Sequence, residues 1–80
     1  MEPTMLFLLL KWLSEYGNEK KLSYDYLVNR NLLTILFTFN KSNSITATRI
    51  TIDFIDLERV HYPKTAFYKI LDKHIKEEQQ

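Results

Sequence analysis

The chain has 80 residues, of which 45% are hydrophobic, and its 11 basic and 10 acidic side chains leave a formal net charge of +1. This length suits one domain, so we expect residues 1–80 to form a single small α+β unit. The absence of cysteine excludes a disulfide framework, thiolate metal sites and a cysteine nucleophile. The near-neutral charge argues against a dedicated nucleic-acid-coating protein, which usually carries a larger basic excess.

The N-terminal segment predicts a helix over Pro3–Tyr16. Proline suits the first helical turn, and Gly17 followed by Asn18 is typical of a helix end. At the helical period the apolar residues cover an arc of roughly 200°, twice the stripe of about 100° that one sheet face needs. They are Met5, Leu6, Leu8, Leu9, Leu10, Trp12, Leu13 and Tyr16.

The same segment is too short for a membrane span. Its unbroken apolar run, Met5–Leu10, is six residues long, against the roughly 20 that a bilayer requires, and Glu2 makes the leading end acidic. We therefore expect a soluble cytoplasmic protein without a membrane partner.

A hairpin is predicted in the middle of the chain. Leu32–Phe39 alternates in polarity, a polar cluster at 40–44 predicts a turn, and Ile45–Phe54 is rich in β-branched residues. Residues 55–60 either extend the sheet or form an irregular connection.

The second strand of this hairpin changes phase. Ile45 and Ala47 share one face of an extended chain, whereas Ile50 and Ile52 share the other. A bulge near Thr48–Arg49 is therefore expected to turn both sets toward the core.

The architecture follows from two further elements. Leu22–Val28 predicts another strand, with a short helix as the alternative, and Pro63–Glu78 predicts an amphipathic helix. The fold class is then α+β in the order α-β-β-β-α, with both terminal helices packed on one face of a three-stranded antiparallel sheet. The other face is expected to carry Thr34, Thr38, Thr46, Thr51 and Asp53, together with Leu32 and Leu36.

Surplus apolar side chains favour a docking function. On the wide N-terminal helix we expect Phe7, Leu8 and Trp12 to remain for a protein interface, with Leu32 and Leu36 on the outer sheet face. The alternative is that this helix lies deep between the sheet and the last helix. We expect a non-catalytic interaction protein that binds either a second copy of itself or a larger protein. The Asn-, Lys-, Ile- and Tyr-rich composition is typical of AT-rich genomes, which favours a phage or viral protein with a host target.

Nucleic-acid binding is the second hypothesis. It would use the basic face of the last helix with two supporting arginines, namely Lys64, Lys69, Lys73, Lys76, Arg49 and Arg30. Double-stranded-RNA-binding domains share the helix, three strands, helix order. Their last helix opens with a lysine cluster, however, whereas residues 62–66 here read Tyr-Pro-Lys-Thr-Ala, so no residue role is carried over.

Catalysis is not expected. Asp53, Asp56, Glu58 and His61 are the closest approach to a cation site, but on a strand Asp53 and Asp56 would face opposite ways. A single glycine excludes a glycine-rich phosphate loop, and zinc-ligand spacing is missing. We therefore expect no metal, no cofactor and no small-molecule substrate.

Overall fold

The computed structural model describes residues 4–41 and 44–79. Its elements are α1 (Met5–Lys20), β1 (Ser23–Asn29), β2 (Leu32–Lys41), β3 (Ser44–Asp53), α2 (Phe54–Leu57) and α3 (Pro63–Gln79). The strands form one antiparallel sheet in the order β1-β2-β3. The predicted α-β-β-β-α order is confirmed, including the strand at 22–28.

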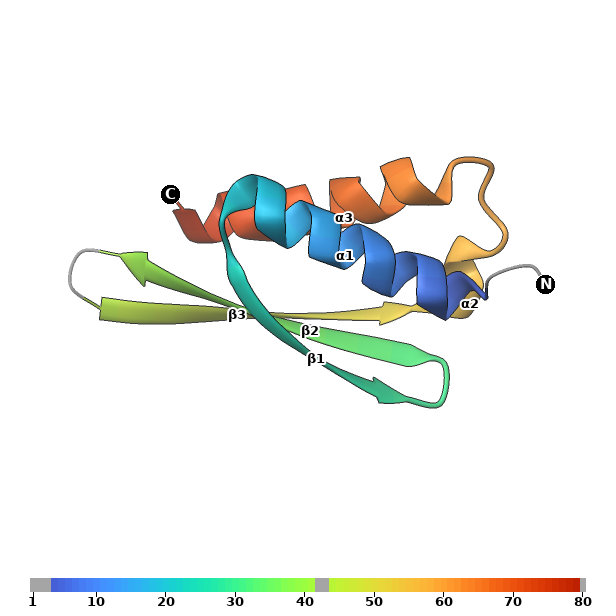
Figure 1. Ribbon diagram of the computed structural model, residues 1–80, viewed down its shortest axis with the longest axis horizontal. Coiled ribbons are helices and arrows are strands. Elements are labelled where there is room, and N and C mark those ends of the chain that lie inside the picture. Colours follow the sequence, from blue (N-terminus) through green and yellow to red (C-terminus); the bar gives the residue numbers. More distant parts are fainter. Residues whose placement is uncertain (1–3, 42–43, 80) are drawn as a thin grey trace.

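Both long helices cover the same face of the sheet, and the opposite face carries no helix among the described residues (Figure 1). Within their layer α1 and α3 lie side by side and run in the same direction. Two hydrogen bonds between the helices agree with this parallel alignment. Each joins residues 56 positions apart in the chain, so a step forward along α1 is matched by an equal step forward along α3. The Tyr68 hydroxyl donates to the Trp12 carbonyl over 3.3 Å, and the Tyr16 hydroxyl donates to the Asp72 carboxylate over 2.7 Å.

The core lies between this helix layer and the inner face of the sheet. Fully or nearly fully buried side chains come from every element except β1; they are Leu9, Leu13, Tyr16, Leu33, Ile35, Phe37, Ile50, Ile52, Leu57, Phe67, Leu71 and Ile75. Their spacing follows the helical period on α1 and α3 and strict alternation on β2. Burial of these faces is the main term that stabilises so small a fold.

The first helix ends later than its sequence predicts. It passes through Gly17 to Lys20, and Lys21 then adopts the left-handed conformation (φ 56°, ψ 47°) with its N–H donating to the Gly17 carbonyl. A Cβ atom at position 17 would lie 2.8 Å from a ring carbon of Tyr24. Gly17 is therefore explained by the close approach of β1, and its interpretation as the helix end was wrong. Pro3 lies outside the described residues.

The predicted bulge in β3 is also wrong. Pairing with β2 is continuous from Leu32 opposite Asp53 to Lys41 opposite Ser44. Without a bulge, Thr46 moves to the inner face, while Ile45 and Ala47 lie on the outer one. The β2–β3 hairpin extends beyond the ends of both helices (Figure 1). Turning Ile45 to the helix side would therefore bury little apolar surface, and this gain would not offset the hydrogen bonds between β2 and β3 that a bulge disrupts.

β3 stops one residue earlier than predicted because Asp53 caps a short helix. Its carboxylate accepts a hydrogen bond from the Ile55 N–H at 3.0 Å, which begins α2. Residues 54–57 thus form the first turn of the connection to α3, and Leu57 enters the core.

Candidate functional site

The uncovered face of the sheet is the most distinctive surface of the molecule. It is formed by alternate residues of the three strands, because successive side chains of a strand point to opposite faces. Large aliphatic side chains remain exposed on it: Leu27 at 67%, Ile45 at 76%, Leu32 at 40% and Leu36 at 38% of their surface. Antiparallel sheets often leave one face to solvent, but that face is then normally polar.

Three of these side chains form one group, which we call the leucine cluster: Leu27, Leu32 and Leu36. Leu27 on β1 pairs with Thr34 on β2, and Leu32 and Leu36 are the residues two positions to either side of Thr34. Diagonal neighbours of this kind lie about 7–8 Å apart, within reach of leucine side chains. The alternation of β2 predicts Leu32 and Leu36 on this face, and the structure confirms that both are exposed there.

The leucine cluster borders a shallow depression of about 390 Å³. Its lining combines two members of the cluster, Leu27 and Leu36, with neighbouring polar groups from all three strands: Asp25, Tyr26, Thr34, Arg49 and Thr51. The Thr34 and Thr51 hydroxyl oxygens lie 3.4 Å apart. The surface therefore offers apolar contact area together with hydroxyl groups that can donate or accept hydrogen bonds.

One row across this face carries both charges. Asp25 on β1 pairs with Leu36 on β2, which in turn pairs with Arg49 on β3. The two charged side chains thus flank the apolar centre on opposite edge strands. The Asp25 carboxylate accepts a hydrogen bond from the Tyr26 N–H at 2.9 Å, which orients it beside the strand.

The predicted interface residues of α1 do not behave as a group. Phe7 is 60% exposed, on the side of the helix opposite the buried Leu9 and Leu13. Leu8 is half-buried, and Trp12 is half-buried against the core. The helix α1 lies on the covered side of the sheet (Figure 1), whereas the leucine cluster lies on the uncovered face, so Phe7 does not share a face with the cluster. The five predicted residues therefore do not form one surface.

The basic residues are likewise dispersed. Lys69, Lys73 and Lys76 are exposed on α3, at spacings that put them on one side of the helix. Lys64 forms an ion pair with Glu15 at 3.3 Å. Arg49 lies on the outer sheet face, away from α3, and Arg30 lies in the β1–β2 turn with a positive φ of 58°. The structure thus brings together three of the six predicted residues.

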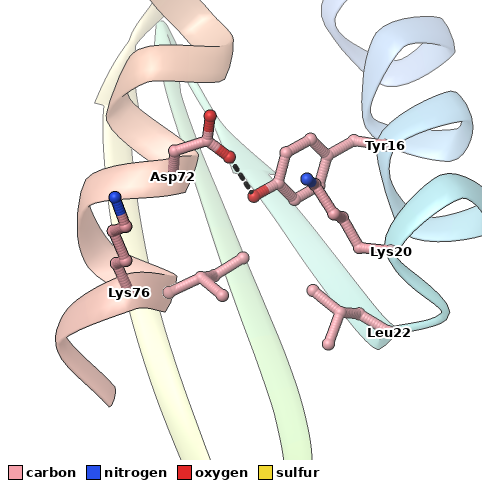
Figure 2. Close-up of a pocket in the computed structure, with 6 residues that line it drawn as sticks. Tyr16, Lys20, Leu22, Asp72 and Lys76 are labelled. Carbon is pink, nitrogen blue, oxygen red and sulfur yellow. Dashed lines mark hydrogen bonds between the residues drawn. The ribbon is translucent and has the colours of Figure 1, made fainter. Parts of the chain in front are cut away.

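A second cavity, of about 360 Å³, lies between the C-terminal halves of α1 and α3 (Figure 2). Its lining is Tyr16, Lys20, Leu22, Asp72, Ile75 and Lys76. The Tyr16 ring is buried and its hydroxyl points to Asp72, while the Lys20 ammonium lies 5.9 Å from the ring centre.

This tyrosine is held as a hydrogen-bond donor. Burial raises the pKa of the Tyr16 hydroxyl well above its ordinary value of about 10, and the hydrogen bond to Asp72 raises it further. Burial likewise raises the pKa of Tyr68, which packs edge-on against Tyr16. A phenol that keeps its proton cannot act as a base near neutral pH, so the arrangement connects α1 to α3 and has no evident chemical role.

The acidic run 53–61 has a structural explanation. Asp53 caps α2, Asp56 lies within that helix, and His61 is exposed in the connection to α3. Across residues 4–41 and 44–79 there is no group of three or more His, Asp or Glu side chains arranged to hold a metal ion.

Leu27, Ile45 and Ala47 on the outer face were missed from the sequence. The position of Leu27 follows from the register of β1, since Tyr24, Tyr26 and Val28 have the inward parity and Leu27 the other. Ile45 and Ala47 were assigned to the core through the bulge that β3 lacks.

Comparisons with protein-family models, curated proteins and solved structures give no significant match to this chain. Within the described part of the chain, no helix combines the length and the apolar content needed to cross a bilayer.

Proposed function

We propose that this chain is a non-catalytic docking domain that binds a protein chain through the outer face of its sheet. The observation that carries the proposal is the leucine cluster, with Ile45 further along the same face. These side chains lie on a regular, hydrogen-bonded sheet, so the backbone that carries them has little conformational freedom left to lose on binding. Fully burying an exposed leucine or isoleucine side chain contributes about 1.5–3 kcal/mol, and docking would gain the share of this that belongs to the surface still exposed.

The distribution of polar groups supports a protein ligand. Hydroxyl groups and single charges surround the apolar centre, which is the arrangement of a protein interface with an apolar core and a polar rim. Among the described residues, the charged ones on this face are Asp25, Asp53 and Arg49, so the described part of the face has no basic excess to attract phosphates. This balance favours a protein partner over a nucleic acid.

Site-specific photocrosslinking in the producing cell tests the proposal. A photoreactive residue at position 27 or 45, on the outer face, should yield an adduct of discrete mass. The same residue at Lys11 or Lys69, on the exposed sides of the helices, serves as the control and should not. No adduct from either sheet position, with the protein present at normal levels, would refute docking through this face.

Nucleic-acid binding remains the second candidate, favoured by the exposed row Lys69, Lys73 and Lys76 on α3. Asp72 lies within the same stretch, and the predicted arginines lie elsewhere, so the basic patch is small. A gel-shift assay at low salt tests this candidate with the triple Lys→Gln variant as the control. Binding that the triple variant loses would support it, whereas an unshifted nucleic acid would exclude it.

A further inference from the structure

We propose that the partner of the outer sheet face is a second copy of this chain, packed face to face about a two-fold axis that runs parallel to β2. This inference depends on the proposed docking function and names its occupant. It is carried by the row Asp25, Leu36, Arg49, whose charges lie on opposite edge strands.

The direction of the axis follows from strand register. A two-fold rotation about a line parallel to β2 places β2 over β2 and β1 over β3 of the second copy. Leu36 then meets Leu36 of the second copy, Leu32 meets Leu32, and Asp25 meets Arg49. Symmetry generates the charge contact twice, because an interface of this type uses the same patch on both partners.

The other in-plane axis is disfavoured by the same row. A two-fold axis perpendicular to the strands through Leu36 would place Asp25 over Asp25 of the second copy and Arg49 over Arg49. Like charges at facing positions are destabilising, and interfaces use such repulsion to select an orientation. Of the two arrangements, the charge pattern therefore selects the one whose axis runs parallel to β2.

The size of the face agrees with a weak dimer. Strands about 4.8 Å apart with a rise of about 3.4 Å per residue give a face of three strands, with seven, ten and ten residues, a footprint of roughly 450 Å². Two copies then bury roughly 900 Å², near the lower limit of specific interfaces at about 1,000 Å². We expect dissociation constants on the order of 10–100 µM, since small interfaces leave little surplus over the cost of association.

Sedimentation equilibrium of the purified full chain tests the inference. The wild type should reach a monomer–dimer equilibrium below about 1 mM, whereas Leu36→Lys or Leu27→Lys should remain monomeric because each puts a charge that must be desolvated into the apolar centre of the interface. Phe7→Lys, at an exposed position on the far side of α1, is the matched control and should dimerise as the wild type does. Circular dichroism checks that each variant is folded, and the two sheet variants provide independent tests.

Charge reversal tests the axis. Asp25→Arg or Arg49→Asp alone should weaken the dimer by roughly tenfold, since each creates two like-charge contacts. The double variant D25R/R49D should return to within about threefold of the wild type because it restores both pairs.

Several results would overturn the inference: a strict monomer at high concentration, a dimer lost in Phe7→Lys but kept in Leu36→Lys, or a double reversal that fails to restore affinity. A strict monomer accompanied by a crosslinked adduct of a different mass at position 27 would remove the second copy and leave the docking function in place. Absence of both the dimer and the adduct would remove the docking function itself.

Discussion

Thr48 offers a sharp test of the packing beneath the sheet. It lies on the inner face of β3 opposite the fully buried Phe37 and is itself only 7% exposed. Its hydroxyl oxygen is buried without a hydrogen-bond partner among residues 4–41 and 44–79. An unsatisfied buried hydroxyl costs about 1–3 kcal/mol, and valine has nearly the same shape with a methyl group in its place. We therefore expect Thr48→Val to raise the free energy of unfolding by about 1–2 kcal/mol.

Urea denaturation and thermal unfolding measure this change. For a chain of this size, about 1 kcal/mol corresponds to a Tm increase of about 4–8 °C. Thr46→Val is the matched control, because Thr46 lies on the same face of the same strand but is only half-buried, so water can reach its hydroxyl. Its stability should change by less than about 0.5 kcal/mol. A Thr48→Val variant that is less stable than the wild type would show that the hydroxyl is satisfied and would refute the reasoning.

Three further substitutions test the remaining packing. Tyr16→Phe should cost about 1 kcal/mol at neutral pH through the lost hydrogen bond to Asp72. Because the pKa of Tyr16 is raised in the folded state, the unfolded chain releases the tyrosine proton at lower pH, and the free energy of unfolding of the wild type should fall above about pH 10. In urea titrations the free energy of unfolding of Tyr16→Phe should fall less over that range. Gly17→Ala should destabilise by about 1–3 kcal/mol in thermal melts, despite the better helix propensity of alanine, because its Cβ would meet the Tyr24 ring. Lys21→Gly should raise the Tm through a gain of about 1 kcal/mol, since glycine adopts the left-handed conformation without steric cost.

The order and packing of the elements could be predicted because each follows from a local period. Alternation identifies β2, and a 3.6-residue stripe identifies the buried face of α3. The end of α1 could not be predicted in this way. Gly17 is a strong local signal for a helix end. In the structure, however, the absence of its side chain makes room for the Tyr24 ring of β1. This contact between two elements cannot be seen in the local sequence pattern, and the helix continues past Gly17.

The candidate site was predicted in part for a related reason. Alternation shows which residues of a strand share a face, so Leu32 and Leu36 could be assigned together. It does not show how far the helices extend over the sheet. The inward assignment of Ile45 assumed that every isoleucine would find cover, whereas the hairpin extends past the helix layer (Figure 1). The sequence also predicts that the excess apolar surface lies chiefly on α1, where the core in fact takes up most of it and leaves Phe7 exposed and Leu8 half-buried.

The apolar residues of the outer sheet face differ from those of α1 in how much of their surface the fold covers. Leu27, Leu32 and Leu36 are exposed in the folded chain, and the threonines beside them show that polar, β-branched residues suit the same ladder. The exposed parts of the three leucines contribute nothing to the stability of the isolated chain, and this holds most for Leu27, which is 67% exposed, unlike Trp12, which packs against the core. Apolar surface that folding leaves uncovered, repeated at three adjoining positions, is typical of an interface. For this reason the leucine cluster is a better candidate for docking than the wider but mostly buried apolar arc of α1.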